Sequence, residues 1–258
     1  MIVCRSAAEL ERLARVNELV ARVLAELKAA VRPGVTTADL DALAEQRLRE
    51  AGAEPAFKGY HGYPATICAS VNEQVVHGIP STRPLADGDI VSVDMGAKLE
   101  GFYGDSAVTV PVGEVDADAA RLLKVTEAAL YKAIEAVKPG ARVSDIGAAV
   151  QAHVEAHGFS VVREFVGHGI GTKLHEEPQI PNYGVAGRGP RLSEGMVLAI
   201  EPMVNFGKAA VKVLGDGWTA VTKDGSLSAH FEHTVVVTSD GARILTQPVA
   251  AAAVGAAR

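Results

Sequence analysis

Two stretches of this chain carry the same pattern: Gly88-Asp89-Ile90-Val91-Ser92-Val93-Asp94 and Gly195-Met196-Val197-Leu198-Ala199-Ile200-Glu201. Each begins with a turn glycine, continues as an apolar run of β type, and ends in a carboxylate at the same offset. A strand built to be buried does not normally end in an acid, because an ionised side chain is costly to bury. Two strands that end alike suggest acids that converge on something positive, and a metal ion is the first candidate.

The repeat extends beyond this motif. Val31-Arg32-Pro33-Gly34 recurs as Val137-Lys138-Pro139-Gly140, at an offset of 106 residues. Apolar residues at helical spacing follow in both copies, and Gly52 and Gly158 stand where those helices would stop. Chance is the alternative, since the identities are sparse. We expect one domain over residues 1–250 made of two related halves, about 7–112 and 116–238, followed by a frayed tail at 251–258.

Composition narrows the classes of protein. The chain has 258 residues, 48% of them hydrophobic and 22% charged, which is ordinary for a globular protein with a full core. Its net charge of −6 argues against a large nucleic-acid-binding face. The two cysteines, Cys4 and Cys68, fit a reducing compartment. No signal peptide and no apolar run of about 18 residues is apparent, so we expect a cytoplasmic protein without membrane or specific nucleic-acid partners.

Hydrophobic periodicity and turn residues predict the order of the elements. Helices are expected at 7–30, 37–51, 116–137 and 144–157, and strands at 65–71, 89–95, 102–112, 161–166, 196–204, 210–214, 218–222 and 229–238. A hairpin loop, Lys98-Leu99-Glu100-Gly101, joins the second and third of these strands. The order helix, helix, strands occurs twice, which is typical of an α+β fold with an antiparallel sheet.

The predicted hairpin brings two acids together. Asp94 and Asp105 lie symmetrically about the loop at 98–101. In a regular hairpin they would face each other, with Cβ atoms roughly 4.5–5.5 Å apart. Like charges at that distance repel, so one acid is protonated or a cation lies between them. The alternative is that one of them simply faces solvent.

Three more candidate ligands lie downstream. His168 stands between glycines after an apolar run, Glu201 ends the second motif, and Glu232 lies within the last strongly apolar strand. A lone histidine among glycines is usually structural. Four acids and a histidine at strand ends of a duplicated domain favour a site for two divalent cations, which would neutralise the acids and activate a water. The oxygen-rich set suits Mn, Fe(II), Co or Zn without selecting one.

The chain also resembles a known family. Its matching segments are Gly59–Pro64, Ser70–Pro80, Gly88–Asp94, Gly104-Asp105, Gly167–Gly171, His175–Pro178, Glu201-Pro202 and Phe231–Thr234. In order and spacing they resemble the type 1 methionine aminopeptidases, a peptidase M24 group with the pita-bread fold shared with prolidase and creatinase. That fold has two pseudo-symmetric halves, each with two helices packed on a curved antiparallel sheet.

The resemblance implies a role for each residue. Asp94 would bind one metal, Asp105 and Glu232 would bridge two, and His168 and Glu201 would complete the second site. A water activated by the two metals would attack the carbonyl of an N-terminal methionine. Glu201 would shuttle its proton, His175 would steady the oxyanion, and His77 would contact the scissile amide or the next residue. No catalytic role is assigned to His61, His153, His157, His230 or His233.

The same resemblance implies an apolar methionine pocket. It would be lined by Tyr60, Tyr63, Cys68, Leu174 and Trp218, with Phe57 near its edge. From the residues alone, core packing is the simpler interpretation of these side chains. Leu174 departs from the family, in which an aromatic residue is common at this place, so the pocket wall is expected to be softer here.

Lengths argue for the subtype. Only 32 residues separate His168 from Glu201, which leaves no room for the insertion of type 2 enzymes. We expect neither a zinc-binding extension nor a separate N-terminal domain, which disfavours prolidase-like enzymes. A proline-directed aminopeptidase and a metal-free binding protein of the same fold remain the alternatives. The expected activity is removal of methionine before a small second residue, by a monomer acting on nascent polypeptides, with transient ribosome contact left open.

Overall fold

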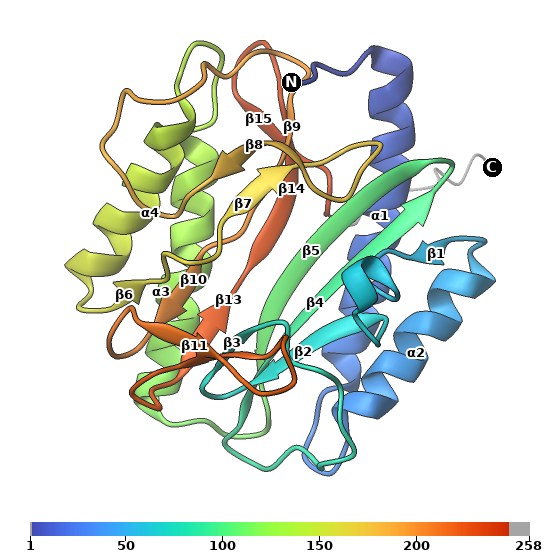
Figure 1. The fold of residues 1–258 in the computed structure, drawn as a ribbon, viewed down its shortest axis with the longest axis vertical. Coiled ribbons are helices and arrows are strands. Elements are labelled where there is room, and N and C mark those ends of the chain that lie inside the picture. The colour runs from blue at the N-terminus through green and yellow to red at the C-terminus, as the bar shows by residue number, and fades with distance from the viewer. Residues whose placement is uncertain (1, 248–258) are drawn as a thin grey trace, which may run out of the picture.

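Four α-helices in two pairs flank the strands of this protein. The computed structural model describes residues 2–247, so residues 248–250 and the expected tail at 251–258 lie outside it. Within that range the helices are α1 (Ala7–Ala30), α2 (Thr37–Glu50), α3 (Ala117–Glu135) and α4 (Val143–Ala156). They confirm the helices expected from periodicity, with small differences at the ends. In Figure 1, α1 passes behind the two long strands near the centre with α2 to its right, whereas α3 and α4 lie together on the left.

Local sequence explains where the first helices begin and end. Ser6 and Glu9 form a capping box at the start of α1, and Thr36 and Asp39 form another at the start of α2. These side chains satisfy backbone N–H groups that a helix leaves without partners. After α2 the chain turns at Gly52, which has a φ of 72°, a left-handed conformation that glycine adopts at no steric cost.

The main sheet has nine strands, and their neighbour relations position the site. Its order is β1-β4-β5-β14-β9-β7-β8, with β15 added to β14 and β2 added to β4. The strands are β1 (Glu54–Pro55), β2 (Ile67–Val71), β4 (Ile90–Leu99), β5 (Phe102–Pro111), β7 (Gly167–Gly169), β8 (Glu176–Ile180), β9 (Val197–Ile200), β14 (Glu232–Val237) and β15 (Ala242–Ile244). Neighbouring strands pair antiparallel.

Two small sheets complete the strands. One has the order β13 (Ser228–His230), β10 (Met203–Asn205) and β6 (Ser160–Val161), and the other has β11 (Val211–Val213), β12 (Ala220–Thr222) and β3 (Gln74–Val76). A short 3₁₀ helix, η1, covers Tyr60–Gly62.

Three of the expected strands differ most from the structure, because they end well short or are divided. The strand expected at 161–166 ends at Val161, and the chain continues as a loop through the exposed Arg163 and Glu164. The strand expected at 196–204 breaks at Glu201-Pro202, where proline cannot donate to a ladder. The strand expected at 229–238 breaks at Phe231. Each break therefore redirects the backbone next to the site described below.

The repeat is visible in the backbone hydrogen bonds. Gly34 N donates to Leu85 O at 2.8 Å and Gly140 N to Leu192 O at 2.9 Å, while Gly88 N donates to Val112 O and Gly195 N to Val237 O, both at 2.9 Å. Isolated bridges join Thr36 to Pro84 and Arg142 to Arg191 in the same way. The α+β class with two pseudo-symmetric halves is therefore confirmed. The division at about 7–112 and 116–238 stays a prediction.

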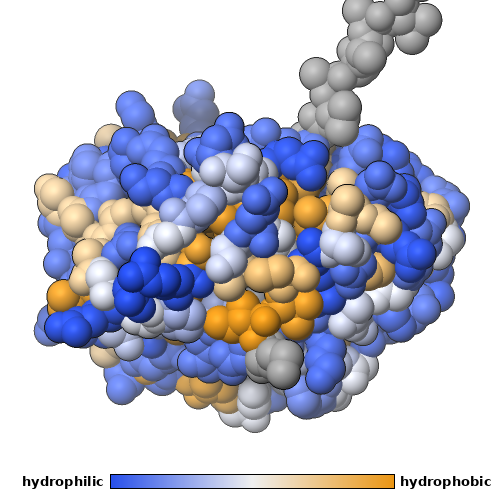
Figure 2. All heavy atoms as spheres, turned by 90° about the horizontal axis from the view of Figure 1, so that it is seen from above, coloured by the Kyte–Doolittle hydropathy of each residue, from blue (hydrophilic) through white to orange (hydrophobic). Residues whose placement is uncertain are grey.

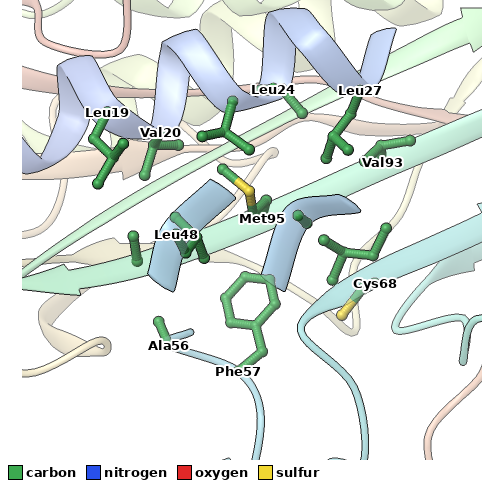
Figure 3. Packing of buried hydrophobic residues seen from close by; sticks show 14 of the residues in the cluster. Leu19, Val20, Leu24, Leu27, Leu48, Ala56, Phe57, Cys68, Val93 and Met95 are labelled. Atoms are coloured by element: carbon green, nitrogen blue, oxygen red, sulfur yellow. The ribbon is translucent and has the colours of Figure 1, made fainter. Parts of the chain in front are cut away.

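Each half has its own core. One apolar cluster gathers under α1 and α2, and a second lies under α3 and α4. In Figure 3, Leu24 and Leu27 of α1 point toward Met95 and Val93 of β4, and Phe57 and Cys68 lie at the edge of the cluster. Figure 2 shows one face on which hydrophilic residues dominate. Among the residues described, no helix combines the length and the apolarity that crossing a membrane requires.

Candidate metal centre

Five neighbouring strands each bring one expected ligand to the same cavity. Asp94 lies on β4, Asp105 on β5, Glu232 on β14, Glu201 directly after β9, and His168 on β7. These strands follow one another in the order β4-β5-β14-β9-β7. Residues up to 138 positions apart in the sequence therefore meet on one face of the sheet, and all five line a cavity of about 380 Å³.

The two aspartates do not face each other as expected. The strands β4 and β5 continue to Leu99 and Phe102, so the turn consists of Glu100 and Gly101 and not of the four residues 98–101. Asp94 is opposite Ala107, and Asp105 is opposite Gly96. The acids are thus diagonal neighbours, offset by two residues. A shift of two keeps both on the same face of the sheet, so both still reach the cavity.

The central group is compact. The ligand atoms of Asp105, His168 and Glu232 all lie within 4.8 Å of one another, and all three residues are buried. His168 Nε2 lies 4.0 Å from Asp105 Oδ2 and 3.7 Å from Glu201 Oε1. Asp94 lies close enough for its charge to raise the pKa of Asp105.

Burial and mutual repulsion perturb every acid of the group. Burial raises the pKa of Asp94 to about 7 and that of Glu201 to about 8. Burial, together with the charges of neighbouring acids, also raises the pKa of Asp105 and of Glu232 well above its usual range. By themselves the acids of this group thus resist ionisation, and a bound cation would reverse this preference.

The donor set fits a divalent metal. Asp94 Oδ1, Asp105 Oδ1 and Glu232 Oε1 are buried and make no hydrogen bond within the described protein. Buried polar atoms without a partner are uncommon, and oxygens of this kind are the ligands that divalent cations prefer. Burial lowers the pKa of His168 to about 3, so its ring is neutral and available as a ligand.

Backbone contacts hold the ligands in place. His168 Nδ1 lies 2.9 Å from the carbonyl oxygen of Gly169, which can only accept, so Nδ1 carries the proton and Nε2 faces the acids with its lone pair. Ser106 Oγ donates to Glu232 O at 2.7 Å, and Thr234 Oγ1 donates to Asp105 O at 2.8 Å. Asn182 Nδ2 donates to Glu201 O at 2.9 Å.

Two further histidines face the same cavity. The His175 ring packs edge-on against His168, with ring centroids 4.3 Å apart. His77 has a φ of 60°, which is unusual for a residue other than glycine, and its ring packs against Phe165 and Trp218. Burial lowers the pKa of His77 to about 4. Both histidines therefore line the cavity that the acids share.

The side chains expected to form the methionine pocket line the same cavity as the acids. Tyr60, Tyr63, Cys68, Leu174, Trp218 and Phe57 all line it. Tyr63 is fixed by its hydroxyl, which donates to Gly78 O at 2.9 Å, and by an edge-on contact with Trp218. These side chains border both the core and the cavity. The same residue can therefore pack in the core and contact a ligand in the cavity.

Some residues of the site were missed. His230 was given no role, yet its Nε2 lies 3.6 Å from Glu201 Oε2 and has no hydrogen-bond partner in the described range. Its position two residues before Glu232 was the signal that could have found it. Phe165 and His61 also line the cavity. Phe165 was expected within a strand and is carried there by the loop after β6. His233, to which no catalytic role is assigned, lines a different cavity.

Comparison with known proteins identifies the family. The model of metallopeptidase family M24 matches residues 11–239. Methionine aminopeptidase 1 of Bacillus subtilis is 54% identical over 96% of this chain and 100% of its own length. The crystal structure of methionine aminopeptidase from Thermotoga maritima superposes with a TM-score of 0.94 at 49% identity, covering 96% of this chain and 100% of that one.

A more distant structure shares the fold alone. Prolidase from Pyrococcus horikoshii has a TM-score of 0.79 at 22% identity, covering 97% of this chain and 65% of the prolidase. The identity to methionine aminopeptidases is far higher and extends over nearly the whole of both chains. This chain therefore belongs to metallopeptidase family M24, among its methionine aminopeptidases.

Proposed function

We propose that this protein removes the N-terminal methionine from peptides and newly made proteins, using two divalent metal ions. The observation that carries the proposal is the cavity itself, in which four acids and a histidine from five neighbouring strands meet apolar side chains. A metallopeptidase of this kind needs both parts in contact, because the pocket must present one peptide bond to the metal centre.

Asp94, Asp105, His168, Glu201 and Glu232 would hold the metal ions. When bound, the ions supply Lewis acidity toward a carbonyl oxygen and lower the pKa of an attacking water. Carboxylate and imidazole ligands suit Mn, Fe(II), Co or Zn. The unpartnered oxygens of Asp94, Asp105 and Glu232 support this assignment.

The protein's own residues would orient the peptide and move protons. Glu201 is the leading proton carrier, because its carboxyl lies beside His168 and His230 and its pKa is raised by burial toward the working pH. His175 would donate Nε2–H to the carbonyl oxygen as negative charge develops there. His77, neutral because of its low pKa, would contact the scissile amide or the second residue.

The pocket would select methionine by shape. An unbranched thioether fits an aromatic and aliphatic wall, and sulfur makes favourable contacts with rings such as those of Tyr63 and Trp218. The second residue would lie near His77, Phe165 and Trp218, which line the cavity, and a small side chain is proposed there because the resemblance to methionine aminopeptidases implies it. Nascent polypeptides in the cytoplasm are the proposed natural substrates, the protein acting as a monomer with at most transient contact with ribosomes.

A peptide panel tests the function. The protein is stripped with a chelator, reloaded with each metal, and assayed on Met-Ala-Ser, Met-Gly, Met-Pro and Xaa-Pro peptides while bound metal is measured. We expect methionine release from Met-Ala-Ser and about two metal ions per chain at full activity. The shared prolidase fold makes an Xaa-Pro aminopeptidase the second candidate, and cleavage confined to Xaa-Pro peptides would exclude the proposed function.

A further inference from the structure

Arg5, far from the metal ligands in sequence, reaches the loop that carries His175. Its side chain is only 5% exposed and forms an ion pair with Glu176, which is 13% exposed. Charges this deeply buried are costly unless they are paired. The pair therefore ties the segment before α1 to the start of β8, immediately after His175.

Glu176 uses its other oxygen to close the loop. Its Oε1 accepts hydrogen bonds from Thr172 N at 2.9 Å and from Lys173 N at 3.1 Å. One carboxylate thus holds two backbone amides on one side and the Arg5 guanidinium on the other. Leu174 and His175 lie between these anchored positions, so their backbone has little freedom to shift.

Arg5 is itself held firmly. Its backbone N–H donates to Gly195 O at 2.8 Å, and its Nη1 lies 3.4 Å from Glu9 Oε1. The guanidinium packs directly on Gly171, where an added Cβ would collide with it. Gly171 has no left-handed φ, so close packing of Arg5 is what excludes a side chain at this position.

We propose that Arg5 is a positioning residue for the reaction. Through Glu176 and Gly171 it holds residues 171–176 and thereby places His175, whose ring faces His168 and the cavity. The proposal rests on the proposed function, in which His175 steadies the carbonyl oxygen. Loss of Arg5 should misplace His175 in the transition state more than it changes methionine binding. The reason is that four of the pocket side chains come from residues 57–68 and therefore lie outside this loop.

Kinetics of metal-loaded variants test this role. Arg5→Ala is expected to lower kcat on Met-Ala-Ser about tenfold, because small misplacements of a catalytic group are costly, while KM changes less than about twofold. Arg5→Lys keeps the charge and retains more of the wild-type kcat than Arg5→Ala. Arg15→Ala is the matched control, since Arg15 pairs with Glu100 on the surface with both side chains half exposed. A wild-type kcat in Arg5→Ala overturns the proposal.

A double-mutant cycle separates positioning from general damage. If Arg5 acts through His175, Arg5→Ala has no further effect on kcat in a His175→Ala background. An equal tenfold loss in both backgrounds refutes that connection. Gly171→Ala offers a second route, because it displaces the guanidinium without removing it. The effect of Gly171→Ala on kcat should disappear in an Arg5→Ala background. If Gly171→Ala lowers kcat equally in the wild-type and Arg5→Ala backgrounds, the packing of Arg5 on this loop is contradicted.

Hydrogen exchange gives a readout that needs neither metal nor activity. In metal-free protein, Arg5→Ala is expected to speed exchange of the Thr172 and Lys173 amides at least about tenfold, because their acceptor loses its anchor. Unchanged exchange in the 171–176 segment also overturns the proposal. If the wild-type protein fails to release methionine, the proposed function fails, and this measurement still decides whether Arg5 holds the loop.

Discussion

The hydroxyl of Tyr60 lies 2.8 Å from Nδ1 of His175. Tyr60 comes from η1 and His175 from the loop before β8, so two segments 115 positions apart meet at the rim of the cavity. Since the phenol has a proton to give and burial lowers the pKa of His175, the neutral ring accepts at Nδ1 and carries its own proton on Nε2. Tyr60 thereby sets which His175 nitrogen carries the proton that the proposed reaction would use.

Removing that hydroxyl tests the relationship. Tyr60→Phe keeps the ring that lines the pocket but leaves Nδ1 free to take the proton. We expect kcat on Met-Ala-Ser to fall about three- to tenfold, the scale of one lost general acid–base contact or less, while KM stays within about twofold. Steady-state kinetics measures both. Tyr183→Phe, outside the cavity, should match the wild type, and an unchanged kcat in Tyr60→Phe would show that the tautomer is set in another way.

Loss of one central acid should remove both metal and activity. Asp105→Asn replaces a buried carboxylate of the compact group by a neutral amide. We expect kcat/KM to fall at least about a hundredfold, because the charge that holds the cations and fixes their geometry is lost. Kinetics and metal content are measured on the same sample. Asp118→Asn, on the exposed start of α3, is the control, and a fully active Asp105→Asn would refute the metal centre.

The candidate ligands could be found in the sequence because neighbouring strands bring an acid or a histidine to one face of the sheet. Asp94 and Glu201 follow equivalent apolar runs of the two halves, and the repeated glycines marked both. The equivalence is incomplete, because β4 continues past Asp94 to Leu99, whereas β9 ends at Ile200, just before Glu201. The register of Asp94 against Asp105 was not predictable, because the turn uses Glu100 at a φ of 50°. Two-residue hairpin turns usually have glycine or asparagine at a position with positive φ. A glutamate such as Glu100 therefore did not indicate a two-residue turn.

Irregular backbone explains the other errors. Phe231 interrupts the expected strand between His230 and Glu232, yet His230 still lies beside Glu201 and Glu232 still lines the cavity. Phe165 reaches the cavity because the chain leaves β6 early, at the exposed charges of Arg163 and Glu164. Long periodic helices such as α1 were predicted well since their apolar stripe spans many turns. Short strands contain too few residues for the pattern of apolar and polar side chains to predict where they end.

Leu174 should control the width of the methionine pocket. It is 2% exposed and lines the cavity beside His175. Leu174→Phe adds volume at this wall, so it should lower kcat/KM about tenfold for a substrate whose first side chain is one methylene longer than methionine. Cleavage after methionine itself should change less than about threefold. Competition between the two peptides measures the selectivity. An equal change in kcat/KM for both peptides would show that Leu174 does not control the selection of the first side chain.

The acids of the metal centre should make the metal-free protein less stable as pH rises. Asp94 and Glu201 have folded pKa values of about 7 and about 8, above the roughly 4 of an unfolded chain. The native state then binds more protons than the unfolded state, so the free energy of unfolding falls with rising pH until the folded groups ionise. Histidines with lowered pKa, such as His168 and His77, make the free energy of unfolding rise with pH, but only below about pH 6.5.

The window from pH 6.5 to 8.5 therefore isolates the acids. In chelator, the wild-type Tm should fall by about 5 °C across this window, and Asp94→Asn/Glu201→Gln should show a clearly smaller fall because its amides do not titrate. Saturating metal should reverse the trend, since deprotonated ligands bind it more tightly as pH rises. Thermal unfolding followed by circular dichroism measures each case. A metal-free wild type whose Tm rises across this window would show that these carboxyls are already ionised in the native protein.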